Sequence, residues 1–599
     1  MTSESSSRGE PDPMVAGLPL MVSQLGMRDG QLTEPSNPAY SIAMLVWFAG
    51  QPHPQLVRQA AEHTCRDAQA TNVVLGVDES GSWTQKVDPT VASSIHMVDF
   101  SAADDPEQAF RAWLSEAVAV PFTLVGSPLL RQTVAVVDDR VAYVAIAHHM
   151  VIDGFGAALV QRRLVSVFAA LSAGEQIPPN PFASLSELAD AVRVPSPQDL
   201  PYWIDYLKDG PSILSFSGDV AAPAPAAITR GTVVSGVRRH GQMWTRLMIG
   251  AIAAYTARHT GMDEAIIGVP VSNRGNHVER RTPAMLMTVL PLRVPVDRAD
   301  SLRVVAREVG RTMAQMSRRT LHRPETLRHA VPSAWRSGRL HGPIANIVPF
   351  EVESVGGDTR CTVEIPNHGP VEDFSLLVAP ESGTDVRVEL TMNPRLYTPA
   401  EADEHMERLA AWLQAVSDDP DRPVRDVPFL TADEERAHER VRGDSSRSGG
   451  LGAAVAWDQP TTPAALAAHA GIDHDVVGAL VLDRVGAPVP FGRPGQVWLL
   501  PGDGTAPIKT GLLASIDSRS MLFCGRLADV RVVHGKSIDV GRLAAEVGAH
   551  EGVLTATVDP TQSKARLLVE VDRGIDAEQT RRHLVRLLPA GVRLRVQTR

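Results

Sequence analysis

One stretch of the sequence constrains the fold of this chain more than any other. It consists of two short segments in which apolar and polar residues alternate, followed directly by a helical pattern. Residues 131–149 read RQTVAVVDDRVAYVAIAHH, with apolar residues alternating on both sides of a turn at 138–140. This alternation predicts a β-hairpin. Apolar residues then recur at helical spacing over 157–173, and the pattern stops at Gly174, which predicts an amphipathic helix with a C-terminal glycine.

Two histidines, an aspartate and a glycine occupy the junction between this hairpin and the helix: His148, His149, Asp153 and Gly154. Successive side chains of a strand point to opposite faces, so the two histidines diverge. A valine and an isoleucine share the face of His148, which indicates a packed core. Two alanines share the face of His149 and leave space there, so we predict that His149 faces a cavity.

The residue types at this junction suit proton transfer. A neutral imidazole accepts a proton near neutral pH, because its ordinary pKa is about 6.5. Gly154 would permit a tight turn and let backbone N–H groups approach a substrate and stabilise an oxyanion. An arbitrary histidine pair is more often a hydrogen-bonded core feature, and neighbouring strand residues cannot easily bind one metal ion together. Asp153 and Gly154 at this spacing favour the functional interpretation.

The chain divides into several stretches that differ in residue pattern and composition. Its 599 residues are too many for one compact core, so we expect three or more folded units. Residues 15–185 and 186–432 each alternate β-like runs with helical patterns, and ligand sites are common in the cleft between two such lobes. Residues 433–471 are charged and then rich in serine and glycine, which is typical of a linker. Residues 472–599 predict a small separate module, and residues 1–14 a disordered tail.

Composition excludes several classes of protein. The net charge of −11 argues against a nucleic-acid-binding surface. No run of about 18 uninterrupted apolar residues occurs, which disfavours a transmembrane helix. Cys65, Cys361 and Cys524 are far apart and lack CxxC spacing, so a zinc site or a disulfide framework is not expected. These features predict a cytoplasmic protein that binds neither nucleic acid nor membrane.

The segment from His148 to Gly154 resembles the HHxxxDG signature of nonribosomal peptide synthetase condensation domains, which chloramphenicol acetyltransferase-like acyltransferases share more loosely. Further similar segments follow in the expected order: NPAYSIAMLVWFAG, LPYWIDYL, IGVPVSNR, TVLPLRV, GPIANIVPFE, GPVEDFSLLVAPE and VRDVPFLTADEER. The late segments resemble the enterobactin-synthase type. The resemblance covers roughly residues 15–435. It implies an α/β fold of two chloramphenicol acetyltransferase-like lobes, a V-shaped pseudo-dimer with a central tunnel, followed by a small α+β module.

The resemblance implies a role for each residue of the signature. His149 would be the catalytic or substrate-positioning residue, and His148 would support it. Gly154 would keep the site open. Whether His149 acts as a general base or mainly orients the amine stays open at this point.

Two later segments would contribute further residues to the site. IGVPVSNR matches the GxPxxxR pattern of the family, whose arginine, here Arg274, would pair with a structural Asp153. An aspartate and a guanidinium form a bidentate pair that can pin two lobes together. Asn346 matches an asparagine that lines the active site of the family. The motif lacks a second aspartate of the kind carried by heterocyclising relatives, so oxazoline or thiazoline formation is disfavoured.

The C-terminal module resembles the end of an adenylation domain in broken form, on the segments VLDRVGAPVPFGRPGQVWLL, IKTGLLA and FCGRLADVRVVHGKSIDVGRLAAEV. Leu512 stands where the family has a ribose-binding aspartate, and Ala528 stands where it has a hinge aspartate. Because leucine cannot hydrogen-bond a ribose hydroxyl, we expect a truncated remnant that makes no acyl-adenylate. A cap for the condensation lobes and a docking surface for a partner are equal alternatives.

Together these features predict an enzyme that joins an acyl thioester to an amine or hydroxyl acceptor, forming an amide or ester. The thioester would be held on a phosphopantetheine arm, and the chain itself would bind no cofactor. Because no LGGxS-type serine segment occurs, the carrier proteins are expected to be separate polypeptides. Two rivals remain: an acyl-coenzyme-A-dependent acyltransferase of the same fold, and a non-catalytic docking or scaffold protein.

Overall fold

The computed structural model divides the chain into two compact units. The first unit comprises Met1–Pro195, Val271–Thr288 and Val352–Pro370, and the second comprises Ser196–Pro270, Val289–Glu351 and Val371–Arg599. The structure describes residues 17–598 except 51, 192, 194, 212–214, 218–219, 322–323, 332–338, 350–353, 357–358, 444–459, 473–475, 483–487, 491–492, 494, 503–504, 518–519, 528–529, 534–535, 551–552, 559–565, 572–575, 586–587 and 589–591. The predicted tail over residues 1–14 and Ala528 lie outside the described residues.

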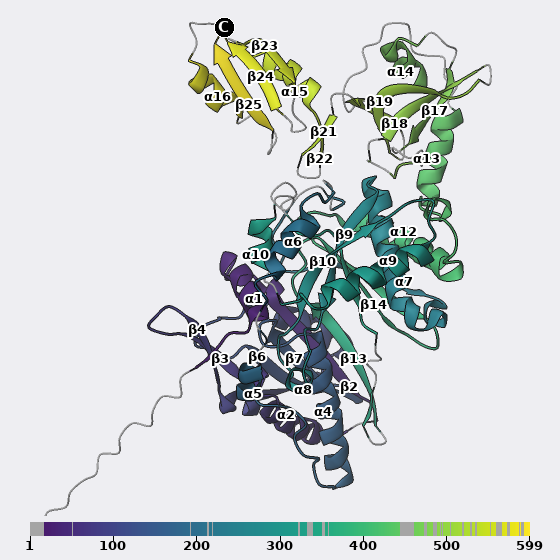
Figure 1. The fold of residues 1–599 in the computed structure, drawn as a ribbon. Coiled ribbons are helices and arrows are strands. Elements are labelled where there is room, and N and C mark those ends of the chain that lie inside the picture. The colour runs from purple at the N-terminus through teal and green to yellow at the C-terminus, as the bar shows by residue number, and fades with distance from the viewer. Residues whose placement is uncertain are drawn as a thin grey trace, which may run out of the picture. The chain divides into compact units, whose positions relative to one another are not determined.

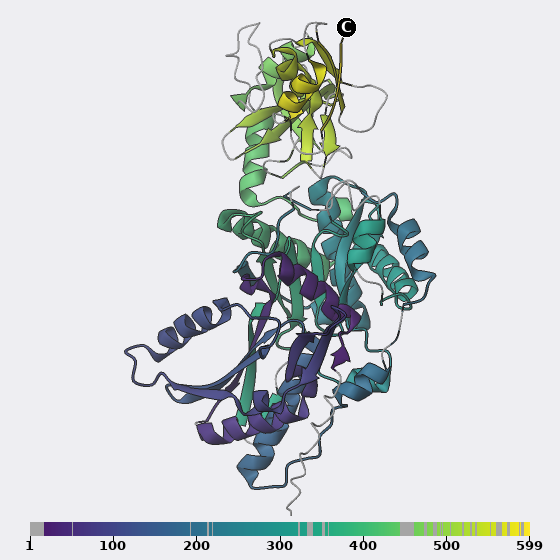
Figure 2. The ribbon, with the colours of Figure 1, turned by 90° about the vertical axis from the view of Figure 1, so that its left-hand side faces the viewer.

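The first unit is built on a six-stranded sheet in the order β12-β13-β2-β7-β6-β5 (Figures 1 and 2). In that order the strands are Ser354–Gly356, Thr359–His368, Ser41–Phe48, Arg140–His148, Leu130–Val137 and Ile95–Asp99. Neighbouring strands are antiparallel, except for the parallel pair β5 and β6. The predicted hairpin is confirmed as β6–β7, and Asp138 of its turn has a φ of 55°.

A small sheet and several helices complete the first unit. The sheet has the order β1-β4-β3, with strands Leu18–Pro19, Trp83–Val87 and Val73–Val77. The helices are α1 (Val22–Thr33), α2 (Pro54–Asp67), α3 (Pro106–Ala119), α4 (Gly154–Ala173), α5 (Leu185–Ala191) and α8 (His277–Arg281). Short 3-10 segments cover Pro38–Tyr40, Gln69–Thr71 and Pro89–Ser93.

Helix α4 confirms the predicted amphipathic helix and begins three residues earlier than the apolar pattern indicates. It starts there because the Asp153 carboxylate caps it by accepting the N–H of Gly156, and it ends at Gly174, whose φ is 67°. It packs against α2 (Figure 1). Among the described helices only α4 is long and apolar enough to cross a membrane, but half of its apolar window is buried inside the protein, as in a core helix.

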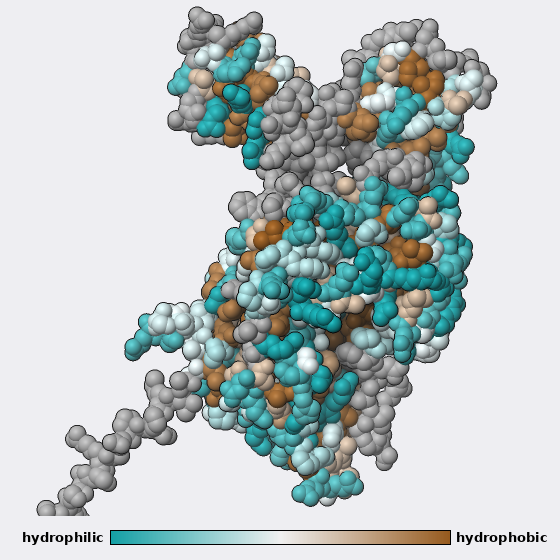
Figure 3. Space-filling model, viewed as in Figure 1, coloured by the Kyte–Doolittle hydropathy of each residue, from teal (hydrophilic) through white to brown (hydrophobic). Residues whose placement is uncertain are grey.

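The second unit contains another six-stranded sheet, in the order β10-β9-β11-β14-β15-β8. In that order the strands are Thr288–Pro295, Glu264–Val271, Ile344–Ile347, Phe374–Pro380, Val386–Met392 and Ile228–Val234. Its helices are α6 (Asp199–Leu207), α7 (Trp244–Thr260), α9 (Leu302–Met316), α10 (Pro324–Ala330) and α12 (Pro399–Asp418), with 3-10 segments at Val237–Met243 and Val424–Asp426. On the face shown in Figure 3, hydrophilic residues cover most of the surface over α7, α9 and α12.

The C-terminal part of the second unit holds two further sheets with separate hydrophobic cores. The first, in the order β16-β20-β19-β18-β17, has strands Pro460–Thr461, Met521–Arg526, Ile508–Ile516, Gly495–Pro501 and Val476–Leu482, with helix α14 at Pro463–Ala470. A two-stranded ribbon follows, β21 (Val530–Val533) with β22 (Lys536–Asp539). The last sheet has strands β23 (Val553–Val558), β24 (Arg566–Val571) and β25 (Arg593–Thr598), with helices α15 (Val540–Gly548) and α16 (Ala577–Val585).

The beginning of the predicted linker is a helix, α13 (Ala432–Gly443). Its Glu434 is fully buried and forms an ion pair with Arg408 of α12 at 2.5 Å. Ala437, one turn later, belongs to the hydrophobic core of the following sheet. The composition predicted a linker here, and the ion pair and the buried alanine hold its first part as ordered structure. The serine- and glycine-rich part of the linker lies outside the described residues.

Candidate active site

His148 is the last residue of β7 and is held in place by two hydrogen bonds. Its side chain is buried, its Nδ1 accepts the N–H of Met150 at 3.1 Å, and its Nε2 lies 3.1 Å from Oε1 of Gln31. Since Nδ1 accepts, this pattern assigns the proton of the neutral ring to Nε2, which donates to Gln31. Burial, and to a smaller degree the neighbouring His149, lowers the pKa of His148 to about 3. His148 is therefore a neutral, structural histidine at neutral pH.

His149 follows β7 directly, and a hydrogen bond fixes its backbone. Its N–H donates to the carbonyl of Tyr40 at 2.8 Å. Nδ1 of the ring is buried and makes no hydrogen bond of ordinary geometry with the described residues. Burial lowers the pKa of His149, opposed by its own backbone, by the charge of Asp153 and by the backbone of Ile152. The ring is therefore neutral at neutral pH, which is the form that accepts a proton.

The ring of His149 is closely surrounded. The residue is only 6% exposed, and that it faces a cavity stays a prediction. Gly369 lies against the ring: a β-carbon at that position would stand 2.6 Å from Cδ2 of His149. Strand alternation correctly indicates small neighbours on β7, but it carries no information about a segment 220 residues further along the chain.

Asp153 is the N-cap of α4, and its carboxylate accepts five hydrogen bonds. Arg274 donates two of them, Nη1 to Oδ2 at 2.8 Å and Nη2 to Oδ1 at 3.0 Å. The backbone N–H groups of Gly156, Leu286 and Met287 donate the others, at 2.8, 3.0 and 3.0 Å. Both oxygens are thus fully engaged, and Asp153 acts on His149 through its charge rather than through a hydrogen bond.

The predicted pairing of Asp153 with Arg274 is present. Both residues belong to the first unit, because the chain after β9 leaves the sheet of the second unit and contributes Val271–Thr288 to the first. Arg274 also donates to the carbonyl of Ala284 at 2.9 Å, and its guanidinium lies 4.6 Å from the centre of the Phe155 ring. The pair therefore fixes the start of α4 against the 284–287 segment.

Gly154 is the first residue of α4 and lies on the exposed side of the signature. Its φ is not in the left-handed region, so the tight turn predicted to need a glycine is not present. A β-carbon at Gly154 would meet nothing within 4 Å. There is room for a side chain at this position, and that Gly154 keeps the active site open stays a prediction.

Asn346 lies in the second unit, on β11. It is half-buried, and its backbone pairs with Leu377 of the parallel strand β14. Its role at the active site stays a prediction.

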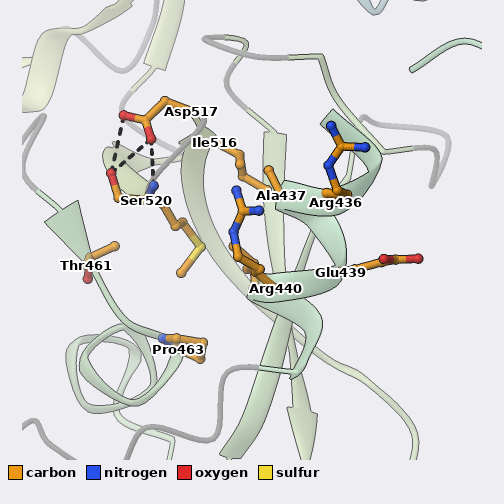
Figure 4. A pocket seen from close by; sticks show the side chains of 11 residues that line it. Arg436, Ala437, Glu439, Arg440, Thr461, Pro463, Ile516, Asp517 and Ser520 are labelled. Atoms are coloured by element: carbon orange, nitrogen blue, oxygen red, sulfur yellow. Dashed lines mark hydrogen bonds between the residues drawn. The ribbon is translucent and has the colours of Figure 1, made fainter. Parts of the chain in front are cut away.

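The C-terminal part of the second unit has a pocket of its own, of about 800 Å³ (Figure 4). It is lined by residues of α13, of β16, of the start of α14 and of the β19–β20 turn, among them Arg436, Arg440, Thr461, Asp517 and Ser520. Leu512 does not line it. This leucine is 3% exposed on β19 and belongs to the hydrophobic core, an environment that offers no site for a ribose.

Sequence reasoning missed two residues that shape the histidine pair. Gln31 lies on α1 and gave no local signal. Gly369 begins the segment GPVEDF, whose glycine–proline pair marks a special backbone conformation, and its φ is +93°. Neither contact is encoded near the signature itself.

Comparison with known proteins shows the family of this chain. Residues 16–438 match the family described as Condensation domain. The isonitrile lipopeptide synthase of Streptomyces coeruleorubidus is 30% identical over 425 residues, which cover 68% of this chain and 29% of that protein. Enterobactin synthase component F of Escherichia coli O157:H7 is 22% identical over 440 residues, which cover 69% of this chain and 33% of that protein. The chain thus matches a third or less of the length of these relatives.

Solved structures of the same fold include two condensation domains. The starter condensation domain of rhizomide synthetase has a TM-score of 0.65 at 24% identity, covering 70% of this chain and 98% of that one. The first condensation domain of the calcium-dependent antibiotic synthetase has a TM-score of 0.63 at 23% identity, covering 70% of this chain and 100% of that one. The predicted α/β condensation-domain fold is confirmed, with an additional C-terminal region that contains sheets. Because the family match takes in residues 16–438, well over half of the 599 residues, the chain belongs to the condensation-domain family, acyltransferase-type enzymes that form amide bonds in nonribosomal peptide biosynthesis.

Proposed function

We propose that this chain transfers a carrier-bound acyl group from its thioester to an amine or hydroxyl acceptor, with His149 at the reacting atoms. The observation that supports this most directly is a neutral, buried imidazole at the second histidine of HHxxxDG, in a signature whose glycine, Gly154, has open space around it. His148, Asp153 and Arg274 hold the backbone around it, and Asn346 is proposed to line the same site. The V-shaped arrangement of lobes with a central tunnel remains part of this proposal.

In the proposed reaction the acceptor nitrogen attacks the thioester carbonyl and forms the new C–N bond. His149 accepts a hydrogen bond from the attacking N–H and receives or steers its proton. The tetrahedral oxyanion then collapses, the C–S bond breaks, and the proton goes to the departing thiolate. Burial of His149 makes an imidazolium costly, and this favours orientation of the acceptor over complete proton transfer. Most of the acceleration would come from holding both substrates in line.

The proposed substrates arrive on phosphopantetheine arms of separate carrier proteins, and the chain supplies no cofactor. A double mutant of the starter condensation domain of rhizomide synthetase has been solved in complex with C8-CoA and Leu-SNAC. Because a coenzyme A derivative is bound in the structure of this relative, an acyl-coenzyme-A-dependent transferase is the second candidate function. Specificity of the enterobactin-synthase type and a cytoplasmic location are further parts of the proposal.

For the C-terminal part we propose a truncated remnant of an adenylation domain, following a condensation N-lobe at 15–185 and a C-lobe at 186–432. The burial of Leu512 in a hydrophobic core supports the loss of nucleotide binding. This part would cap the condensation domain or dock a partner. A purely non-catalytic docking protein is the alternative for the whole chain.

The test is product formation by the purified full chain, followed by mass spectrometry of the carrier-bound acyl groups. A panel of acyl thioesters is offered on a carrier protein and, in parallel, on coenzyme A, with aminoacyl thioesters as acceptors. Product from carrier-bound but not coenzyme-A-bound donors is expected, and the reverse preference would select the second candidate. His149→Ala should abolish product, whereas His96→Ala, at an exposed position on β5, should not. Unchanged product with His149→Ala would support the docking protein.

A further inference from the structure

Gly369 is the residue that closes over the ring of His149. Its φ of +93° lies in the region that favours glycine, and an added β-carbon would stand 2.6 Å from Cδ2 and 3.4 Å from Nε2 of His149. Carbon atoms in ordinary contact are about 3.5–4.0 Å apart, so an alanine here cannot coexist with the present ring position. The Cδ2–Nε2 edge of the imidazole therefore rests on bare backbone.

The sheet of the first unit brings Gly369 to this place. Ile42 of β2 pairs with Ala147 of β7 on one side and with His368 of β13 on the other. The three strands are thus in register at the end of β7, and the residue after His368 arrives beside the histidine pair. A register shift in β13 between Glu364 and Asn367 precedes this point.

A side-chain contact then fixes the backbone of Gly369. Its N–H donates to Oδ1 of Asn367 at 3.1 Å, which closes a short turn at the end of β13. A β-carbon at Gly369 would also lie 3.4 Å from Cγ2 of Ile42, so the strand on the other side leaves little room for movement. The position of Gly369 is therefore set by the sheet and by Asn367, independently of the ring.

The ring of His149 depends on this contact because no side chain of the described residues holds it by a hydrogen bond. Nδ1 makes none of ordinary geometry, and the carboxylate of Asp153 is saturated by five other donors. Packing against Gly369, together with the nearby backbone of His149 and Ile152, therefore sets the side-chain torsion angles of His149. A displacement of about 1 Å at a reacting group can cost a factor of about 100 in rate.

We propose that Gly369 is a positioning residue of the condensation reaction, whose missing side chain fixes the orientation in which His149 presents its ring to the acceptor. This inference rests on the proposed function of His149. It adds a residue that lies 220 positions away from the signature and does not itself touch the reacting atoms.

The decisive comparison is Gly369→Ala against Gly126→Ala, both in the full chain. Gly126 also has a positive φ, +75°, but a β-carbon there would meet nothing within 4 Å, so it controls for backbone strain alone. The rate of product formation, the KM of each thioester and the ring Cδ2–Hδ2 signal of His149 in selectively labelled protein are measured. Gly369→Ala should lower kcat by about 100-fold with little change in KM, and should shift the ring signal, since the imidazole is displaced. Gly126→Ala should change neither.

A folded Gly369→Ala protein with kcat within twofold of wild type and an unmoved ring signal would overturn the inference. Should that variant fail to fold, Asn367→Ala removes the acceptor for the Gly369 N–H without adding bulk. It should lower kcat several-fold and shift the same signal, and an unchanged rate and signal would again reject the role. If the wild type forms no product, the proposed function fails, while the ring signal still decides whether Gly369 sets the position of His149.

Discussion

The guanidinium of Arg274 holds both carboxylate oxygens of Asp153, at 2.8 and 3.0 Å, with the two side chains only 2% and 1% exposed. The pair connects the cap of α4 to a segment more than 100 residues away. The same carboxylate accepts hydrogen bonds from three backbone N–H groups. Removal of the Asp153 carboxylate would therefore leave several buried donors without an acceptor.

Arg274→Ala is expected to lower the free energy of unfolding of the first unit by about 3–5 kcal/mol, because it leaves a buried carboxylate without its countercharge. The measurement is urea denaturation of the full chain, followed by hydrogen exchange of the amides in α4. The matched control is Arg303→Ala, since Arg303 pairs with Asp421 at the surface, with side chains 28% and 65% exposed. That variant should be indistinguishable from wild type. Equal stability of both variants would show that the buried pair contributes nothing.

His148 should make the stability of the first unit depend on pH in a defined window. Its pKa is about 3 in the folded protein and about 6.5 in the unfolded chain, so between these values only the unfolded chain binds the proton. Stability is therefore unaffected above pH 6.5 and falls as the pH drops toward 3, by at most about 1.4 kcal/mol per pH unit. Denaturation of wild type and His148→Gln at pH 7.5, 6.5, 5.5 and 4.5 isolates this contribution. Parallel curves for the two proteins would contradict it.

His149 should remain neutral when the pH falls through 6.5, because burial lowers its pKa. The acid limb of the pH–rate profile should accordingly have its midpoint below 6.5, as should the titration of the His149 ring signal. The charge of Asp153 opposes this shift, so Asp153→Asn should move the midpoint further down. A midpoint at or above 6.5 in wild type would mean that the ring is solvated rather than buried.

Local sequence patterns predicted the part of the site that lies within one continuous stretch of the chain. Strand alternation and helical spacing predicted the β6–β7 hairpin and α4, and so the junction that bears His148 and His149. The pairing of Asp153 with Arg274 followed from the GxPxxxR resemblance rather than from any periodicity. These features need only local sequence or a recognised motif.

Long-range pairing produced the features that could not be predicted. The contact of Gly369 with His149 depends on β13 joining β2, a register that nothing near residue 149 encodes. The charged residues of α13 suggested a linker. The local sequence does not show that Glu434 is buried, since its partner Arg408 lies on another helix. In both places a distant partner decides the environment, and the local sequence does not encode that partner.

The chain is expected to activate no carboxylic acid with ATP. Leu512 is packed in the core of the β16–β20 sheet and cannot bind a ribose hydroxyl. Amino-acid-dependent exchange of pyrophosphate into ATP should stay at background for every acid tested. Leu512→Asp should not restore exchange and should lower the melting temperature, because it buries a carboxylate among apolar side chains. Exchange above background in the wild type would show that the C-terminal part still makes an acyl-adenylate.

Gly154 and Gly156 should respond in opposite ways to the same substitution. A β-carbon at Gly156 would lie 3.0 Å from Cγ1 of Ile152 and 3.2 Å from the backbone N and O of Ala284, whereas one at Gly154 would meet nothing. Gly156→Ala should therefore lower the melting temperature. Gly154→Ala should raise the free energy of unfolding by about 0.4–1 kcal/mol, since alanine loses less conformational entropy and its φ is accessible here. If the open space at Gly154 receives substrate, the stabilised variant should still condense more slowly, with the larger effect in KM. Full activity in a stabilised Gly154→Ala protein would place the substrate elsewhere, because no other change distinguishes the two proteins.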